Sequence, residues 1–349
     1  MCPICKHVEA LTGYVPGEQP HFAGMVKLNT NENPYPPSPK VGEAVAAFDW
    51  QTLRLYPDPI FNKARAVIAQ NVGCRPEQIF IGNGSDEILA LVTRAFVEVN
   101  GTVGYFDPTY SLYSVLTAIR DARTVAVPLH EDFSCPLPPA DIADLFVWTN
   151  PNAPTSLMAD PATVATFAKT FKGILLVDEA YADFAPANCM ALATAPENKN
   201  VLVMRTLSKS FSLAGLRFGY CVGPEPLIEA LYKIKDSYNM DALAQVIGTA
   251  ALSDLPYMEA NAARIRATRA SLTATLEGRG WSVLPSATNF LFAKPPAGKA
   301  AADLFAALRE KHIYVRYFPG PKTGDWMRIT IGTDEQVKTL LDALATLGA

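Results

Sequence analysis

Two side chains of complementary chemistry follow two apolar runs of this chain. Lys209 lies in the segment RTLSKSF, and Asp178 lies upstream of it in the segment VDEAY. The amine of a lysine can form a Schiff base with an aldehyde, and a carboxylate can keep a pyridine nitrogen protonated. Pyridoxal phosphate (PLP) is a cofactor that needs both groups, so the pair predicts a PLP site.

Both residues follow segments typical of buried parallel strands. Residues 173–177 and 201–204 are short apolar runs rich in branched side chains. Ligands of open α/β sheets bind at the carboxyl ends of the strands, and Asp178 and Lys209 come just after two such ends. Taken singly, Asp178 could cap a helix and Lys209 could be a solvated loop charge. Their joint position favours the cofactor.

Phosphate-binding groups are found near the same strand ends. Gly82 and Gly84 lie between an expected strand and an expected helix, where the backbone can approach an anion and N–H groups at the helix start attract phosphate. A tight turn without a ligand is the alternative. Thr206, Ser208 and Arg217 offer two hydroxyls and a guanidinium around the lysine, which suit a dianionic phosphate.

Other polar and aromatic side chains could hold the ring and the substrate. Tyr110 could stack on an aromatic cofactor, or it could be core packing. Asn152 and Tyr181 could both donate to a ring hydroxyl oxygen and so stabilise a phenolate. Arg328 lies in a strand-like run, where an arginine is costly unless it meets an anion. A substrate carboxylate fits this need, and a structural salt bridge is the alternative.

Composition limits the class of protein. The chain has 349 residues, of which 49% are hydrophobic and 18% charged, enough for a large core and about two domains. The net charge of −4, without long runs of one sign, argues against nucleic acid and anionic membrane surfaces as partners. Because the first 20 residues lack an apolar signal core and no long apolar span occurs, we expect a cytoplasmic protein.

The cysteines do not predict a metal site. Cys2 and Cys5 form a lone CxxC pair with His7 nearby, and a structural zinc site would need a second pair. The four histidines of the chain are scattered. We therefore expect reduced cysteines and no metal.

The alternation of strand and helix patterns predicts the α/β class. We expect a large domain over residues 42–255, with a mostly parallel sheet flanked by helices. Residues 1–41 and 256–349 should form a smaller α+β domain. The expected strands of the large domain are 79–81, 102–106, 124–128, 145–148, 174–177, 201–204 and 218–222, and those of the smaller one 281–284, 289–292, 313–316 and 327–331.

Nine ordered segments carry a resemblance to a known family. They are 27–36 (KLNTNENPYP), 54–59 (RLYPDP), 82–87 (GNGSDE), 107–110 (DPTY), 150–155 (NPNAPT), 177–181 (VDEAY), 205–209 (RTLSK), 214–220 (AGLRFGY) and 315–321 (VRYFPGP). From about residue 14 onward the chain resembles the fold-type I PLP enzymes of the class I and II aminotransferases. Within them it is most similar to the histidinol-phosphate aminotransferases of histidine biosynthesis.

The resemblance implies a role for each matching residue. Lys209 would bind the cofactor aldehyde and then move a proton, and Asp178 would pair with the ring nitrogen. Tyr56 would reach the phosphate of a neighbouring subunit, which implies a homodimer with shared sites. The ring would be held by Tyr181, Asn152 and Tyr110, the phosphate by Ser85, Asp86, Thr206, Ser208 and Arg217, and the substrate by Arg328, Arg316 and Asn31.

The resemblance implies transamination between histidinol phosphate and 2-oxoglutarate, and two other activities stay open. One is decarboxylation of threonine phosphate, and the other is transamination of aromatic amino acids on the same scaffold. A PLP-fold regulatory protein is disfavoured, because the net charge is negative and no helix-turn-helix segment precedes the fold. Ser156 stands where the family usually has glycine, and we expect it to be tolerated there if its φ is negative.

Overall fold

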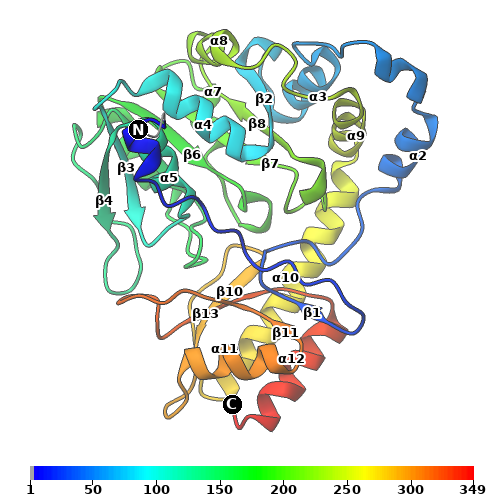
Figure 1. Cartoon of the computed structure of the whole chain (residues 1–349), viewed down its shortest axis with the longest axis vertical. Coiled ribbons are helices and arrows are strands. Elements are labelled where there is room, and N and C mark those ends of the chain that lie inside the picture. The colour runs from blue at the N-terminus through cyan, green and yellow to red at the C-terminus, as the bar shows by residue number, and fades with distance from the viewer. Residues whose placement is uncertain (1–3) are drawn as a thin grey trace.

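The computed structural model describes residues 4–349, and its largest element is a seven-stranded sheet in the order β2-β8-β7-β6-β5-β3-β4 (Figure 1). The sheet is parallel except for β8, which runs antiparallel to both neighbours because a loop without a crossover helix joins it to β7. This confirms the predicted α/β class. The strands are β2 (Ile79–Asn83), β3 (Thr102–Asp107), β4 (Arg123–Pro128), β5 (Leu145–Thr149), β6 (Ile174–Asp178), β7 (Val201–Thr206) and β8 (Phe218–Val222).

Helices cover both faces of this sheet, and each face has its own apolar core. Leu202 of β7 packs on the side of α4, α5 and α8, whereas its neighbour Val203 packs on the side of α3, α6, α7 and α9. Strands buried on both faces explain the continuous apolar runs in the sequence. The helices are α3 (Asn62–Val72), α4 (Gly84–Phe96), α5 (Leu112–Ile119), α6 (Pro161–Thr170), α7 (Met190–Thr194), α8 (Glu225–Ile234) and α9 (Ala242–Leu252).

A second group of elements lies at the other end of the molecule (Figure 1). Its four-stranded antiparallel sheet has the order β12-β13-β10-β9, and the two-stranded sheet beside it pairs β1 near the N-terminus with β11. These elements are β1 (Val26–Lys27), β9 (Ser282–Val283), β10 (Phe290–Lys294), β11 (Ile313–Tyr314), β12 (Arg316–Tyr317), β13 (Met327–Thr330), α10 (Leu255–Gly278), α11 (Ala301–Glu310) and α12 (Asp334–Thr346). The division into domains at residues 41 and 255 stays a proposal.

One expectation for this region needs correction. The single strand expected over residues 313–316 is two short strands, because β11 pairs with β1 whereas β12 pairs with β13 in the other sheet. The N-terminal region contains α1 (Lys6–Glu9), β1 and the start of α2 (Pro39–Ala47). Short 3-10 helices lie at Trp50–Arg54 (η1), Pro76–Gln78 (η2), Ala182–Phe184 (η3) and Ala214–Leu216 (η4).

Within residues 4–349, no helix combines the length and the apolar character needed to cross a membrane.

Candidate active site

The predicted cofactor residues gather at one edge of the seven-stranded sheet. β2, β3, β5, β6 and β7 are parallel to one another and end at this edge, and β8 begins there. Loops at such strand ends are where open α/β sheets bind ligands. These positions carry Ser85 and Asp86 after β2, Tyr110 after β3, Asn152 after β5, Asp178 and Tyr181 at and after the end of β6, Thr206, Ser208 and Lys209 at and after the end of β7, and Arg217 before β8.

The carboxylate of Asp178 is enclosed by the protein. It accepts hydrogen bonds from the Tyr113 hydroxyl at 2.7 Å and from the backbone N–H of Ala180 at 3.1 Å. Burial raises the pKa of Asp178 to about 6, although both hydrogen bonds favour the ionised form. A cation that approached this carboxylate would lower its pKa again, which is what a protonated pyridine nitrogen would do.

Tyr113 is a residue of this site that the sequence analysis missed. Its hydroxyl lies 2.7 Å from Asp178 and 2.8 Å from the Thr149 hydroxyl, so it joins the ends of β5 and β6. The sequence could have indicated this role, because Tyr113 lies three residues after Tyr110, a spacing that places both on one side of a helix. In the structure this side of α5 faces the sheet.

Lys209 lies beside Tyr181 without an acidic partner. Its Nζ donates to the carbonyl of Thr30 at 3.3 Å and lies 5.8 Å from the centre of the Tyr181 ring. In the part of the chain that the structure describes, Lys209 forms no ion pair. An amine that is not tied to a carboxylate is available to react with an aldehyde.

The predicted substrate residue Asn31 is bonded to the protein through both ends of its amide. Its Nδ2 donates to the Tyr181 hydroxyl at 2.9 Å, and its Oδ1 accepts from the Thr330 hydroxyl at 2.9 Å. Its φ of 56° lies in the left-handed region, where non-glycine residues are rare and often functional. In this geometry Asn31 orients Tyr181, and a contact with substrate stays a prediction.

Asn152 and Tyr110 lie in the loops after β5 and β3. Asn152 Nδ2 donates to the carbonyl of Pro108 and to the hydroxyl of Thr155, each at 3.0 Å, so it must exchange one of these bonds to reach a ring oxygen. The Tyr110 ring meets the Tyr113 ring edge to face at 5.6 Å. The Tyr14 ring also meets the half-buried Tyr110 ring edge to face, at 5.7 Å, so stacking of Tyr110 on a cofactor stays a prediction.

A cradle of hydroxyls and one guanidinium lies between β2, β7 and β8. The Thr206 hydroxyl donates to the Ser208 hydroxyl at 2.9 Å, and Arg217 Nη2 donates to Asp86 at 3.1 Å. Gly84 begins α4 with a φ of 78°, and a Cβ there would lie 2.6 Å from the Arg217 guanidinium. Glycine is therefore required for the approach of Arg217 to this helix start, where an anion is favoured.

Arg328 and Arg316 form a pair of cations without a neutralising acid. They are register partners in β13 and β12. Among residues 4–349 neither forms an ion pair, which argues against the structural salt bridge considered for Arg328. Arg328 donates from Nη2 to the carbonyl of Asn29 at 2.8 Å, and its buried Nε has no partner.

The surroundings of Arg328 favour an incoming anion. Burial lowers its pKa to about 10, and the nearby charge of Arg316 acts in the same direction. The guanidinium still stays charged at neutral pH, and it lies 5.3 Å from the rings of both Phe290 and Phe318. Like charges side by side with an unused N–H donor are stabilised by a bound carboxylate or phosphate.

Tyr56 lies on the surface. Its side chain is 80% exposed and stacks on Tyr238 with 4.3 Å between ring centres. Exposed apolar side chains accompany it in the same stretch of chain, namely Val45, Trp50, Leu53, Leu55 and Ile60.

Ser156 corrects an expectation about the backbone. It was expected to need a negative φ, but its φ is 65° and its side chain is fully buried. Hydrogen bonds hold this conformation, because its N–H donates to Asn152 O at 2.9 Å and its carbonyl accepts from Ala287 N at 2.9 Å. The turn therefore keeps the shape that a glycine would adopt.

The expectation that Cys2 and Cys5 bind no metal falls partly outside the structure, because Cys2 precedes the described residues. Cys5 is exposed and unpaired. In residues 4–349, no group of three potential metal-binding side chains comes together.

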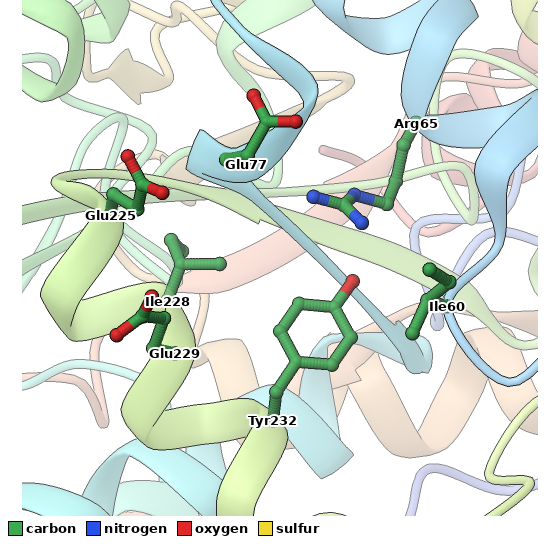
Figure 2. A pocket seen from close by; sticks show the side chains of 7 residues that line it. All are labelled: Ile60, Arg65, Glu77, Glu225, Ile228, Glu229 and Tyr232. Atoms are coloured by element: carbon green, nitrogen blue, oxygen red, sulfur yellow. The ribbon is translucent and has the colours of Figure 1, made fainter.

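A hollow of about 120 Å³ lies elsewhere, between α3, η2 and α8 (Figure 2). Arg65 Nε donates there to the carbonyl of Pro76 at 2.8 Å and its guanidinium lies 5.4 Å from the Tyr232 ring. The hollow carries none of the predicted site residues, and we assign it no role. It is lined by Ile60, Arg65, Glu77, Glu225, Ile228, Glu229 and Tyr232.

Comparisons with known proteins give matches over nearly the whole chain. The profile of the family described as aminotransferase class I and II matches residues 23–344. Histidinol-phosphate aminotransferase 2 of Thiobacillus denitrificans is 45% identical over 350 residues, covering 97% of this chain and 96% of the relative. Histidinol-phosphate aminotransferase 1 of Nostoc sp. is 42% identical over 347 residues, covering 98% and 97%.

A solved structure shares the fold over the whole chain. The crystal structure of histidinol-phosphate aminotransferase from Sinorhizobium meliloti in complex with pyridoxal-5'-phosphate aligns with a TM-score of 0.86. The alignment covers 100% of this chain and 98% of that chain at 24% identity.

Proposed function

We propose, from the premise that this chain belongs to the class I and II aminotransferases, that it transfers the amino group of histidinol phosphate to 2-oxoglutarate. The products are imidazole-acetol phosphate and glutamate. Relatives named for this activity, 41–45% identical over nearly their whole length, support the choice of substrate. The observation that carries the proposal is the pair of unneutralised arginines, Arg328 and Arg316, which are register partners in β13 and β12.

The two substrates demand such a pair. Histidinol phosphate carries a phosphate and no carboxylate, whereas glutamate carries two carboxylates. One site must therefore bind different anions in turn. Arg328, with its buried and unpartnered Nε, would take the α-carboxylate of glutamate, and Arg316 would assist at the distal anion.

The residues at the sheet edge fit pyridoxal phosphate. Bound there, it supplies an aldehyde for amines and a ring that takes up electron density. Asp178 holds a proton on the ring nitrogen, because the buried carboxylate gains a cationic partner. Lys209 holds or moves the proton at the reacting carbon.

The other members of the site bind and orient. Tyr181 and Asn152 would donate to the ring oxygen, and Tyr110 would cover a face of the ring. The phosphate would enter the cradle at the start of α4, where backbone N–H groups attract anions. That cradle consists of Ser85, Asp86, Thr206, Ser208 and Arg217.

A homodimer with shared sites is part of the proposal. The exposed Tyr56 and its apolar neighbours in residues 45–60 support it, because a concentration of exposed large apolar side chains is typical of a protein–protein interface. Tyr56 would then reach the phosphate in the neighbouring subunit. A cytoplasmic location is also retained as part of the proposal.

A substrate panel tests the proposed reaction. Purified protein is supplied with PLP, 2-oxoglutarate and, separately, histidinol phosphate, phenylalanine, tyrosine or threonine phosphate, and glutamate and carbon dioxide are measured. The proposal expects glutamate formation to be fastest with histidinol phosphate. Faster transfer from phenylalanine or tyrosine would replace it with the aromatic activity, and carbon dioxide from threonine phosphate would replace it with the decarboxylase.

A further inference from the structure

The carboxylate of Asp183 accepts hydrogen bonds from residues on both sides of Lys209 in the sequence. Its Oδ1 accepts from Arg205 Nη1 at 3.1 Å, and its Oδ2 accepts from the hydroxyl of Ser210. Arg205 lies at the end of β7, and Ser210 directly follows Lys209. The Asp183 side chain therefore connects the start of the loop after β7 to the residue that follows Lys209. Asp183 itself lies in η3, two residues after Tyr181.

The arginine in this connection is itself locked in place. Arg205 also donates from Nε and Nη2 to one oxygen of Glu179, at 3.0 and 2.8 Å. Glu179 directly follows Asp178, and its side chain is 0% exposed, against 17% for Asp183. Hydrogen bonds between charged groups are strong when water is excluded in this way. The loop after β6 and the loop after β7 are thus braced against each other.

A third segment, near the N-terminus of the chain, also contacts the Lys209 loop. We call the contacts of Asp183 and Asn33 with this loop the clamp. Asn33 Nδ2 donates to the carbonyl of Lys209 at 3.1 Å and to the carbonyl of Ser210 at 3.0 Å. The backbone at Lys209 is therefore held from the N-terminal segment as well as through Asp183. Both sets of contacts hold the backbone from which the Lys209 side chain extends.

We propose that Asp183 is a positioning residue that sets the Lys209 amine for condensation with the cofactor aldehyde. This inference rests on the proposed function. In the condensation the lysine nitrogen adds to the aldehyde carbon, a carbon–nitrogen double bond replaces the carbon–oxygen bond, and water leaves. Pyridoxamine phosphate carries an amine in place of the aldehyde and cannot condense. The clamp therefore contributes to binding of pyridoxal phosphate and not to binding of pyridoxamine phosphate.

The ratio of the two affinities tests this. Full-length protein freed of cofactor is titrated with pyridoxal phosphate and with pyridoxamine phosphate. The ratio is the dissociation constant for pyridoxamine phosphate divided by that for pyridoxal phosphate. Lys209→Ala defines the ratio in the absence of condensation. For Asp183→Asn the ratio should fall about tenfold from the wild-type value toward that reference, equal to about 1.4 kcal/mol. This is close to one hydrogen bond to a charged group.

Two further variants separate positioning from folding. Ser210→Ala removes one arm of the clamp and should lower the ratio in the same direction, even if Asp183→Asn folds poorly. Ser38→Ala is the matched control. Its hydroxyl also donates to an aspartate, Asp254, and lines the same small hollow as Ser210, but it does not hold the lysine loop. It should leave the ratio unchanged.

The outcomes distinguish this inference from the proposed function. If Asp183→Asn and Ser210→Ala weaken both ligands equally, or leave both unchanged, the positioning role is wrong while the cofactor assignment stands. If the wild-type protein shows the same ratio as Lys209→Ala, the cofactor assignment itself fails and takes this inference with it.

Discussion

Replacing Asp178 with asparagine should stabilise the cofactor-free protein while damaging the enzyme. Asp178 is buried, and its pKa of about 6 stands above the ordinary value of 3.8. The folded state therefore bears a penalty for an ionised carboxylate that no cation neutralises until the cofactor binds. Asparagine has nearly the same shape and can keep one of the bonds from Tyr113 or Ala180, but it carries no charge.

The size and the sign follow from linkage. Above pH 6 the group is ionised in both states, and the difference of about two pKa units costs the folded state about 3 kcal/mol. As the pH falls through 6, the folded state takes up a proton that the unfolded state does not bind until about 3.8. The penalty is then about 1.6 kcal/mol at pH 5 and vanishes below the unfolded pKa. The gain from Asp178→Asn should shrink in the same way.

Urea unfolding of the cofactor-free wild type and Asp178→Asn between pH 5 and pH 8 measures this difference. Taking the difference cancels other titrating groups, provided that the two proteins unfold in one cooperative step. With PLP bound the order should reverse. The protonated ring nitrogen neutralises the wild-type carboxylate, so PLP affinity should fall by about two orders of magnitude in the variant, and turnover by several orders.

Two results would refute this reasoning. A stability difference independent of pH would mean that Asp178 does not titrate near 6 in the folded protein. Unchanged PLP affinity and turnover in a folded Asp178→Asn would mean that this carboxylate does not serve the ring nitrogen.

Three further predictions concern the other site residues. Lys209→Ala should abolish transamination and the yellow colour, and borohydride reduction of the wild type should attach the cofactor to the peptide with Lys209; a label on another peptide contradicts the assignment. Arg328→Ala should raise the Michaelis constant for glutamate strongly, through a loss of about 2–5 kcal/mol of binding, whereas Arg316→Ala should affect histidinol phosphate more than histidinol. Equal effects of both arginines on all substrates would reject the division of roles. Mixing inactive Tyr56→Ala and Lys209→Ala subunits should restore some activity, because hybrid dimers would contain one site with both residues intact; no recovery after verified subunit exchange argues for self-contained sites.

The sheet and its functional edge could be predicted because their signals are local. Strands buried on both faces are continuous apolar runs, and a run ends at a polar residue near the end of its strand, as at Asp178, the last residue of β6. Parallel strands place such ends at one edge, so the approximate site follows from the order of the segments. In the second group of elements, residues 313–316 were expected to form one strand, but β11 and β12 pair with two different sheets, and sequence alone does not show the pairing partner.

The hydrogen-bond network could not be predicted, because it joins segments far apart in the sequence. Asp183 meets Ser210, and Asn33 meets the Lys209 carbonyl, only after the three loops are packed together. The same is true of Arg316, whose place opposite Arg328 depends on the register of β12 and β13. Residue type alone left a salt bridge possible for Arg328, and only the packed structure shows that no acid faces it in the part of the chain described.

Ser156 shows how a departure from a family pattern can leave the backbone unchanged. From the side chain alone, a negative φ was the reasonable expectation, since a left-handed non-glycine residue costs about 1–2 kcal/mol. The structure has a φ of 65° because Asn152 and Ala287 fix both peptide groups of the turn. Those bonds join the loop that carries Asn152 to the segment before β10. The conformation is therefore required by the packing of the Asn152 loop against this segment, and the residue at its centre adapts to it.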